Sequence, residues 1–288
     1  MLVCGGQGKE TPTIRDLFVN NHSSIIRHVW NDGNIDAEAV YSASEGYSII
    51  SFDVTDDGKK MILSEGKPFL HLGDRILDPK VDYYGIGSTN LVLADLENNE
   101  SIVVDTFNGT YGEGARWLAE VGLSPNDRYF YALIGGWEWN SLYFFSFPDA
   151  IRLPDIPIIG DGVNPVCWSG NGNILYADYF THGDPEANNN NIMYFDLLES
   201  QSGILEEPCD SIIPPDVLLS QGVGPTDSDR KIYQSIWSPD GQIIVRVVSE
   251  NIVLEDCRSQ EQKVLLEYNP VSIYEKMPAK NMIRVIWE

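Results

Sequence analysis

The sequence predicts an all-β protein built as a β-propeller of five blades. Three observations predict it: a Trp-Ser-Pro-Asp-Gly turn between strand-like runs, weaker copies of this turn earlier in the chain, and blade-length intervals between the copies. A β-sandwich with similar turns is the alternative. The strands of a sandwich, however, need not share one turn motif at such intervals.

The clearest unit occupies residues 236–267 and contains the Trp-Ser-Pro-Asp-Gly turn at Trp237. Runs rich in Val and Ile alternate there with short polar stretches, as expected of four strands joined by turns. Asp240 and Gly241 suit the first hairpin, because Gly tolerates the positive φ that a tight turn requires. The unit therefore reads as one complete blade.

Weaker copies of the unit place apolar residues in the position of Trp237, at Val54, Leu123 and Trp168. Leu123 and Trp168 are 45 residues apart, which matches a four-stranded blade of about 40–50 residues. The intervals from Val54 to Leu123 and from Trp168 to Trp237 are longer and require insertions. Residues 67–88 and 201–231 are the candidates.

The end of the chain resembles the innermost strand of a further blade. Trp287 falls in the position of Trp237, but no hairpin follows it. Because a propeller must close its ring to protect its sheet edges, we expect N-terminal residues to supply the outer strands of this blade. Residues 25–30 and 39–43 are the candidates. This gives five blades, or six if one insertion hides a degenerate blade.

The repeated turn resembles the WD-like repeat of TolB-type propellers, in which an aromatic-Ser-Pro-Asp-Gly turn is the hallmark. The copy at Trp237 matches closely, those at Leu123 and Trp168 match in part, and the copy at Val54 keeps only Asp-Gly. The resemblance runs from about residue 47 to the end and implies a propeller. It does not imply a function, because propellers host unrelated chemistries. We expect residues 1–12 to be a flexible linker and 13–288 a single propeller domain.

The composition excludes some partners. The formal net charge is −24, from 43 acidic and 19 basic residues among 288. A nucleic-acid backbone would be repelled by such a surface, so no nucleic-acid partner is expected. No run of about 18 apolar residues occurs, so no membrane-spanning helix is expected. Solubility is the simplest reason for the charge; a salt-rich environment, a cationic partner and divalent cations are alternatives.

The cysteines suggest a compartment. Leu2–Gly6, followed by a polar stretch with Thr and Pro, resembles the region around the lipidated cysteine of bacterial lipoproteins. The resemblance implies a lipid on Cys4, an extracytoplasmic location in the periplasm or at the cell surface, and membrane contact only through that lipid. The alternative is a disordered N-terminal tail on a cytoplasmic protein. Cys167 is expected to be buried in a strand, whereas Cys209 and Cys257 could pair in an oxidising compartment.

No catalytic residue can be assigned from the sequence. It has no Gly-x-Ser-x-Gly elbow and no HExxH motif, and none of its four histidines is spaced as a metal-binding pair. No Cys or His spacing suggests zinc. Enzymatic activity is left open, with a non-enzymatic role favoured, and no cofactor or metal site is expected.

Two segments are candidate ligand sites. Trp137, Glu138 and Trp139 lie between the second and third strands of a blade, and residues at i and i+2 share one side of a strand. Aromatic rings beside a carboxylate suit sugar rings or peptide side chains, although packing between blades would also use them.

The second candidate segment is a loop that contains His182, Asp184 and Glu186. Its oxygen ligands make calcium conceivable, but EF-hand spacing is absent and a solvated loop is the alternative. The predicted function is a non-enzymatic extracytoplasmic scaffold that binds a protein or glycan on one face. The alternative is a propeller lactonase, lyase or sugar-active enzyme with polar residues at the central channel.

Overall fold

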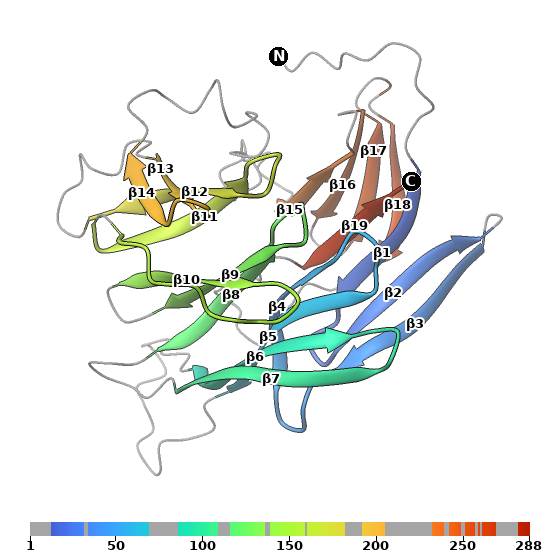
Figure 1. Ribbon diagram of the computed structural model, residues 1–288. Helices are drawn as coiled ribbons and strands as arrows, with labels where there is room; N and C mark the ends of the chain where they lie inside the picture. Colours follow the sequence, from blue (N-terminus) through green and yellow to red (C-terminus); the bar gives the residue numbers. More distant parts are fainter. Residues whose placement is uncertain are drawn as a thin grey trace, which may run out of the picture. The chain divides into compact units, whose positions relative to one another are not determined.

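The computed structural model describes residues 13–31, 34–68, 86–108, 116–135, 139–158, 160–181, 192–204, 232–238, 242–248, 251–256, 259, 261–268 and 282–288. These residues form nineteen strands and no helix, which confirms the predicted all-β class (Figure 1). No helix capable of crossing a membrane occurs among them. The chain divides into two compact units, Met1–Ser42 with Leu218–Glu288 and Ala43–Val217. The single domain expected over 13–288 stays a prediction.

The first unit contains two four-stranded sheets, ordered β19-β1-β2-β3 and β15-β16-β17-β18. The strands of the first sheet are β1 (Ile14–Asn20), β2 (Ser24–Asn31), β3 (Asn34–Ser42) and β19 (Ile283–Trp287). Those of the second are β15 (Ile232–Trp237), β16 (Ile243–Val248), β17 (Asn251–Asp256) and β18 (Gln262–Glu267).

The two ends of the chain share one sheet. β19 pairs with β1 in antiparallel register, with Val285 opposite Leu17 and Ile283 opposite Val19. The Glu288 N–H also donates to the Thr13 carbonyl at 2.8 Å. The expected union of a C-terminal strand with N-terminal strands is therefore present within this sheet. Residues 25–30 lie in β2 and residues 39–43 overlap β3 of this sheet, as predicted, whereas β1, which lies between them and β19, was not predicted.

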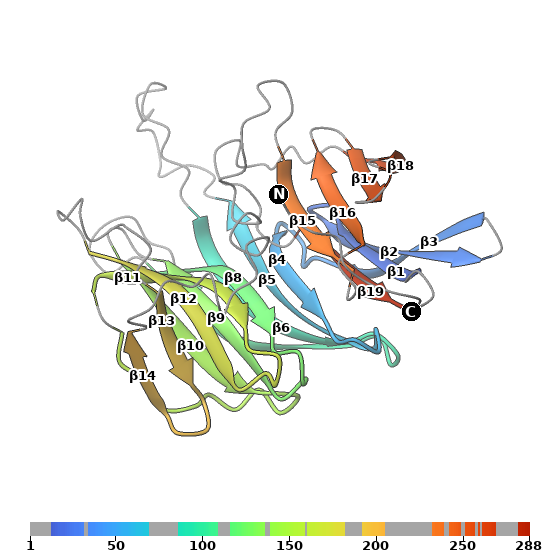
Figure 2. The same ribbon diagram turned by 90° about the horizontal axis from the view of Figure 1, so that it is seen from above.

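The second unit contains three sheets that follow one another in chain order (Figure 2). The first is β4 (Ser48–Val54), β5 (Lys60–Pro68), β6 (Ile86–Asp95) and β7 (Glu100–Asn108). The second is β8 (Trp117–Leu123), β9 (Tyr129–Gly135) and β10 (Asn140–Ser146). The third is β11 (Gly162–Trp168), β12 (Ile174–Phe180), β13 (Ile192–Asp196) and β14 (Gln201–Ile204).

The β8–β10 sheet, which we call the middle sheet, departs from the four-stranded blade that the spacing predicts. It has three strands, and the segment after β10 adds only one bridge, between Arg152 and Phe145. Two prolines, Pro148 and Pro154, lie on either side of Arg152 in the chain. The Leu153 N–H donates to the Phe144 carbonyl at 2.8 Å and the Ser146 N–H to the Ile151 carbonyl at 2.9 Å, so the returning segment pairs with β10 over a short stretch.

The four predicted turns share one pattern of hydrogen bonds. Each begins with a hydroxyl residue: Thr55, Ser124, Ser169 and Ser238. In every copy this hydroxyl oxygen accepts the N–H of the residue five positions on, at 2.9–3.1 Å. In the first three copies the hydroxyl also donates to the Asp or Asn two positions on, at 2.6–2.7 Å. The hydroxyl and the Asx side chain set this turn, so copies without Trp or Pro keep its geometry.

The apolar faces of adjacent sheets in the second unit pack on one another. Phe130 of β9 is fully buried, and its ring stacks on that of Phe145 at 4.8 Å between centroids. The cluster around Phe130 includes Ile62 of β5 and Leu91 of β6. Tyr131 and Leu133 lie on the other face of β9 and pack in a second cluster with Val163 of β11 and Leu175 of β12. Alternate residues of one strand thus serve two cores.

Side chains of the β4–β7 sheet form hydrogen bonds with backbone groups at the free edge of β8. The Leu118 N–H donates to Thr89 Oγ1 at 2.8 Å, and its carbonyl accepts the Ser64 hydroxyl at 3.0 Å. The Leu123 N–H donates to Asp53 Oδ2 at 2.9 Å. A buried strand edge without partners would cost free energy, so these polar residues fasten one sheet to the next.

The same device joins other sheets within each unit. The Val163 N–H of β11 donates to Asn140 Oδ1 of β10. In the first unit, Gln234 Oε1 of β15 accepts the N–H groups of Met282 and Ile283, at 2.7 and 2.9 Å, and Gln234 Nε2 donates to the Ile283 carbonyl at 3.0 Å. One glutamine therefore satisfies three backbone groups at the start of β19.

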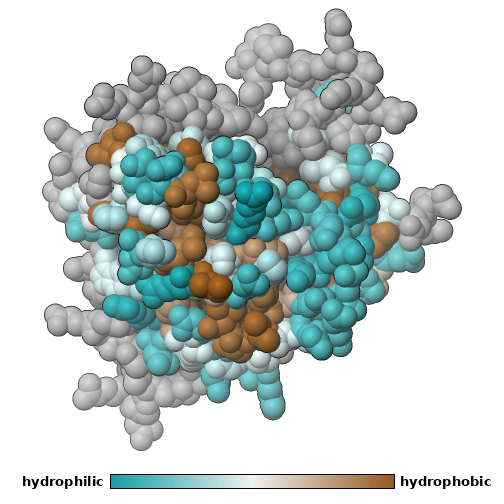
Figure 3. Space-filling view, in the orientation of Figure 1, coloured by the Kyte–Doolittle hydropathy of each residue, from teal (hydrophilic) through white to brown (hydrophobic). Residues whose placement is uncertain are grey.

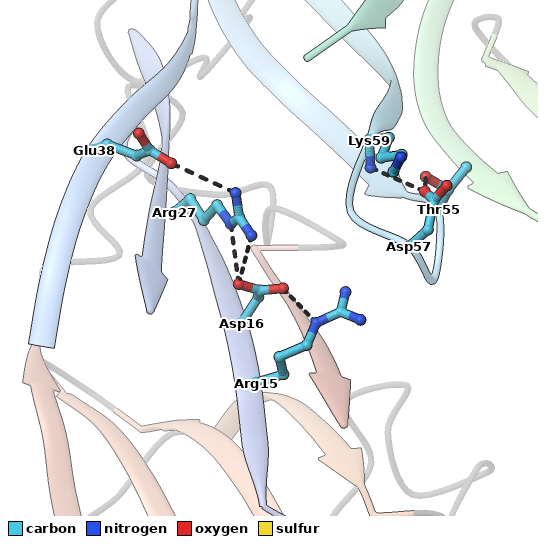
Figure 4. A network of polar contacts seen from close by, with 7 residues as sticks. All are labelled: Arg15, Asp16, Arg27, Glu38, Thr55, Asp57 and Lys59. Carbon is cyan, nitrogen blue, oxygen red and sulfur yellow. Dashed lines mark hydrogen bonds and ion pairs between the residues drawn. The ribbon is translucent and has the colours of Figure 1, made fainter. Parts of the chain in front are cut away.

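A buried carboxylate in the first unit is neutralised by two arginines (Figure 4). The Asp16 side chain is 1 % exposed and accepts from Arg27 Nε and Nη2 at 3.0 and 2.9 Å, and from Arg15 Nε at 2.8 Å. Arg27 also reaches Glu38 at 3.5 Å. Because an isolated buried charge is costly, this network keeps Asp16 compatible with the sheet interior.

His28 of β2 should make stability depend on pH. Burial lowers the pKa of its imidazole below 6.5, and its buried Nδ1 has no hydrogen-bond partner within the described part of the chain. As pH falls below 6.5, the unfolded chain takes up a proton that the folded chain resists, so stability should fall. We expect urea midpoints to drop between pH 7.5 and 5.5, and His28→Leu to flatten that drop. An unchanged slope in the variant would show that other groups cause it.

Candidate functional site

Of the residues proposed as ligand contacts, the structure describes Trp139. Trp137, Glu138, His182, Asp184, Glu186 and the proposed lipid site Cys4 lie outside the described residues, as do Cys209 and Cys257. Cys167, expected to be buried, is half-buried in β11. Trp139 directly precedes β10, which places it between the second and third strands of the middle sheet, as predicted.

The ring of Trp139 is half-buried and faces a cation. The guanidinium carbon of Arg116 lies 5.6 Å from the centroid of this ring. Arg116 is exposed and directly precedes β8, so β8 and the β9–β10 connection bring the two together. A Cβ at Gly135 would lie 2.6 Å from the Trp117 ring, so any other residue there would force this ring to move. The Trp139 ring thus supports an arginine, and its role as a ligand contact stays a prediction.

Tyr143 of β10 lies between two arginines. Arg116 Nη1 donates to Tyr143 Oη at 3.5 Å, and Arg152 Cζ lies 3.7 Å from the centroid of the Tyr143 ring. The ring of Phe107, from β7, lies 6.2 Å from that of Tyr143 at 45°. We call Arg116, Trp139, Tyr143 and Arg152 the arginine–aromatic cluster.

The chain returns to the sheet edge to place Arg152. Ala150 adopts a φ of 53°, and the Ile151 carbonyl then accepts the Ser146 N–H at 2.9 Å. Arg152 thereby lies opposite Phe145, whose side chain shares a face of β10 with Tyr143. Diagonal neighbours on one face of paired strands are within reach of long side chains, which explains the contact between Arg152 and Tyr143.

The cluster concentrates positive charge in an acidic chain. Arg152 Nη2 contacts Asp155 Oδ1 at 2.6 Å, with the Asp155 side chain 77 % exposed. Arg116 has no carboxylate partner among the residues that the structure describes. Two cations within one surface contrast with a net charge of −24. The surface can therefore attract an anionic group that the rest of the chain would repel.

One exposed apolar side chain borders the cluster. Ile151, the neighbour of Arg152, is 62 % exposed. On the face shown in Figure 3, hydrophobic side chains (brown) form patches among hydrophilic ones (teal). Exposed apolar atoms next to hydrogen-bond donors are typical of binding surfaces.

A buried acid–phenol contact lies elsewhere in the second unit, within one sheet. Tyr131 donates to Glu120 Oε1 at 2.8 Å, and burial together with Glu120 raises the pKa of the phenol well above its ordinary value. Both groups lie within the middle sheet, on β9 and β8. The described residues hold no group of three His, Cys, Asp or Glu that could bind a metal ion. Calcium in the His182–Glu186 loop stays a prediction.

No protein-family model matches this sequence, and no curated protein matches it. Among solved structures, the crystal structure of oligogalacturonate lyase from Vibrio parahaemolyticus superposes with a TM-score of 0.50 at 12 % identity, over 88 % of this chain and 63 % of that one. That enzyme is a β-propeller. The likeness shows the fold.

Two other solved structures give lower TM-scores. TolB from Acinetobacter baumannii gives 0.41 at 14 % identity, over 88 % of this chain and 53 % of that one. An oligogalacturonate lyase in complex with manganese gives 0.49 at 12 % identity, over 96 % and 69 %. This chain thus spans 63 % of the length of the Vibrio lyase and about half that of TolB.

Sequence reasoning missed Arg116, Tyr143 and Arg152. Arg116 directly precedes an aromatic residue, and Tyr143 alternates with buried residues along β10. Arg152 lies several residues beyond β10, between two prolines of the chain. A scarce arginine in an acidic chain was the only available signal, and it did not show that three segments would meet.

Proposed function

We propose that this protein is a non-enzymatic β-propeller scaffold that binds a protein or glycan ligand at the arginine–aromatic cluster. Five blades would form the ring, with N-terminal strands and β19 contributing one blade together. The pairing of β19 with β1 and the fold likeness to a propeller enzyme support this architecture. A six-bladed ring stays the alternative.

One observation carries the binding role: two arginines and two aromatic rings from separate segments meet at one partly exposed surface. Buried aromatics and arginines are the residue types that contribute most to protein interfaces. Arg116 has no acidic partner in the described part of the chain; it donates from Nη1 to Tyr143 Oη and rests on the Trp139 ring. A surface built only for packing between sheets would have little use for such a cation.

A binding screen with a Trp139 variant tests this function. Wild-type protein, Trp139→Ala and Trp139→Phe are applied to a glycan array and to a displayed peptide library. We expect ligands that Trp139→Ala binds at least tenfold more weakly, that Trp139→Phe largely retains, and that are recovered chemically unchanged. Mass spectrometry of the bound ligands shows whether they are chemically unchanged. Cleavage of a ligand, or retention that ignores Trp139, contradicts the proposal and favours the propeller-enzyme alternative.

We also propose an extracytoplasmic location with a lipid on Cys4, on the resemblance of residues 2–6 to lipoprotein sequences. Radioactive palmitate supplied to a bacterium that expresses the full gene should label the wild type but not Cys4→Ser. A wild-type protein that stays unlabelled contradicts lipid anchoring.

A further inference from the structure

The two guanidinium groups of the arginine–aromatic cluster are held by rings. Arg116 lies against Trp139 at 5.6 Å and Arg152 against Tyr143 at 3.7 Å, measured from Cζ to ring centroid. A guanidinium that rests on a ring keeps N–H donors at its rim, where a carboxylate can accept two of them. Ring contact also restricts the long side chains before binding, which reduces the entropy that a ligand must overcome.

The same contacts occupy the aromatic surfaces that a sugar ring would need. Arg152 covers Tyr143, whose ring also approaches that of Phe107 at 6.2 Å. Trp139 is half-buried and carries Arg116. Because the rings support guanidinium groups, the cluster offers charged donors more than bare aromatic platforms. This favours a ligand recognised by its carboxylates over one recognised by stacked sugar rings.

The separation of the arginines suits two carboxylates. Both contact Tyr143, one at its hydroxyl at 3.5 Å and the other at its ring at 3.7 Å. The two groups therefore lie no more than roughly 10 Å apart, one Debye length at moderate ionic strength. Alternate side chains of an extended peptide point the same way at intervals of about 7 Å, which long Glu side chains can adjust.

We propose that the arginine–aromatic cluster binds an extended acidic segment of a partner protein, with two carboxylates at positions i and i+2 held by Arg116 and Arg152. This inference rests on the proposed binding function and specifies its partner. The acidic remainder of the chain offers such a peptide few competing sites, because 43 of its residues are acidic. The cluster would therefore be selective.

Asp155 already occupies part of the proposed site. It contacts Arg152 at 2.6 Å as an exposed i,i+3 pair. Exposed pairs of this kind are weak, so a ligand carboxylate can displace Asp155. Removing the Asp155 charge should therefore strengthen binding, an effect that a general loss of structure could not produce.

Fluorescence anisotropy of a labelled dodecapeptide of alternating Glu and Thr, added to the full chain, tests the proposal. We expect binding to weaken about tenfold in Arg116→Gln and in Arg152→Gln, and to tighten severalfold in Asp155→Asn. Arg128→Gln is the matched control, because Arg128 is an exposed arginine of the same unit outside the cluster. A dodecapeptide of alternating Gln and Thr should not bind.

Three results would overturn the inference. Equal binding of the Gln peptide would show that charge is not read, and equal weakening by Arg128→Gln would show that only net charge matters. Binding of a galacturonate oligomer through Arg116 and Arg152, without binding of the Glu peptide, would replace the peptide by a uronate. In each case a Trp139-dependent ligand from the array or library would leave the scaffold function standing, whereas its absence would remove both proposals.

Discussion

An aspartate in place of Trp287 should lower the free energy of unfolding by about 3 kcal/mol. Trp287 ends β19, lies opposite Ile14 of β1 and packs on the core of the first unit. The change removes apolar contacts of a half-buried ring and places a charge beside that core. The effect should exceed what the second-last position of a chain normally suggests, because β19 is an integral strand of its sheet.

Urea denaturation followed by tryptophan fluorescence and by circular dichroism measures this effect. Val264→Asp is the matched control, because Val264 is 56 % exposed on β18 of the same unit and should change stability by less than about 0.5 kcal/mol. Trp287→Phe should retain most of the stability. If Trp287→Asp unfolds at the same urea concentration as the control, the terminal strand does not hold this unit together.

Replacing Gln234 by methionine should lower the free energy of unfolding by about 3 kcal/mol. The two side chains have similar volumes, so packing is largely kept. The Met282 N–H and both backbone groups of Ile283 lose their Gln234 partners, which donate or accept at 2.7–3.0 Å in the wild type. Unsatisfied, partly buried backbone groups carry the penalty, whereas the loss of a surface amide would not.

Hydrogen exchange measured by mass spectrometry should locate the second effect. Protection should fall at residues 282–287 in Gln234→Met, with little change in the second unit. Gln262→Met supplies the control, because Gln262 is exposed on β18. Full retention of protection at Ile283 would mean that water or another group replaces the glutamine at no cost.

The repeated turns show how far local sequence can predict structure. Their Ser or Thr and their Asp or Asn make hydrogen bonds within a few residues, so these turns can be predicted without knowledge of the tertiary structure. The strands around each turn could also be predicted from local sequence, because runs of Val, Ile and aromatic residues favour extended backbone. β1 was missed because Arg15 and Asp16 interrupt its apolar run, and only the network with Arg27 makes that buried acid acceptable.

The middle sheet illustrates what blade-length spacing cannot predict. The interval from Leu123 to Trp168 has room for four strands, yet in place of the last one the described residues show a single bridge between Arg152 and Phe145. That irregular return of the chain is also what places Arg152 beside Tyr143. The irregular segment that replaces a fourth strand therefore contributes Arg152 to the candidate site.

The sequence by itself determined the all-β class and the positions of the four turns, because these depend on contacts between near neighbours and on strand periodicity. The use of both chain ends in one sheet followed from the need of a propeller to protect its sheet edges. Trp139 could be singled out from its position between two strands. The tertiary structure decided that its ring supports Arg116 and that Tyr143 joins Arg116 to Arg152, because these residues come from segments separated by whole strands. Their shared surface depends on register and packing between strands, which no local pattern specifies.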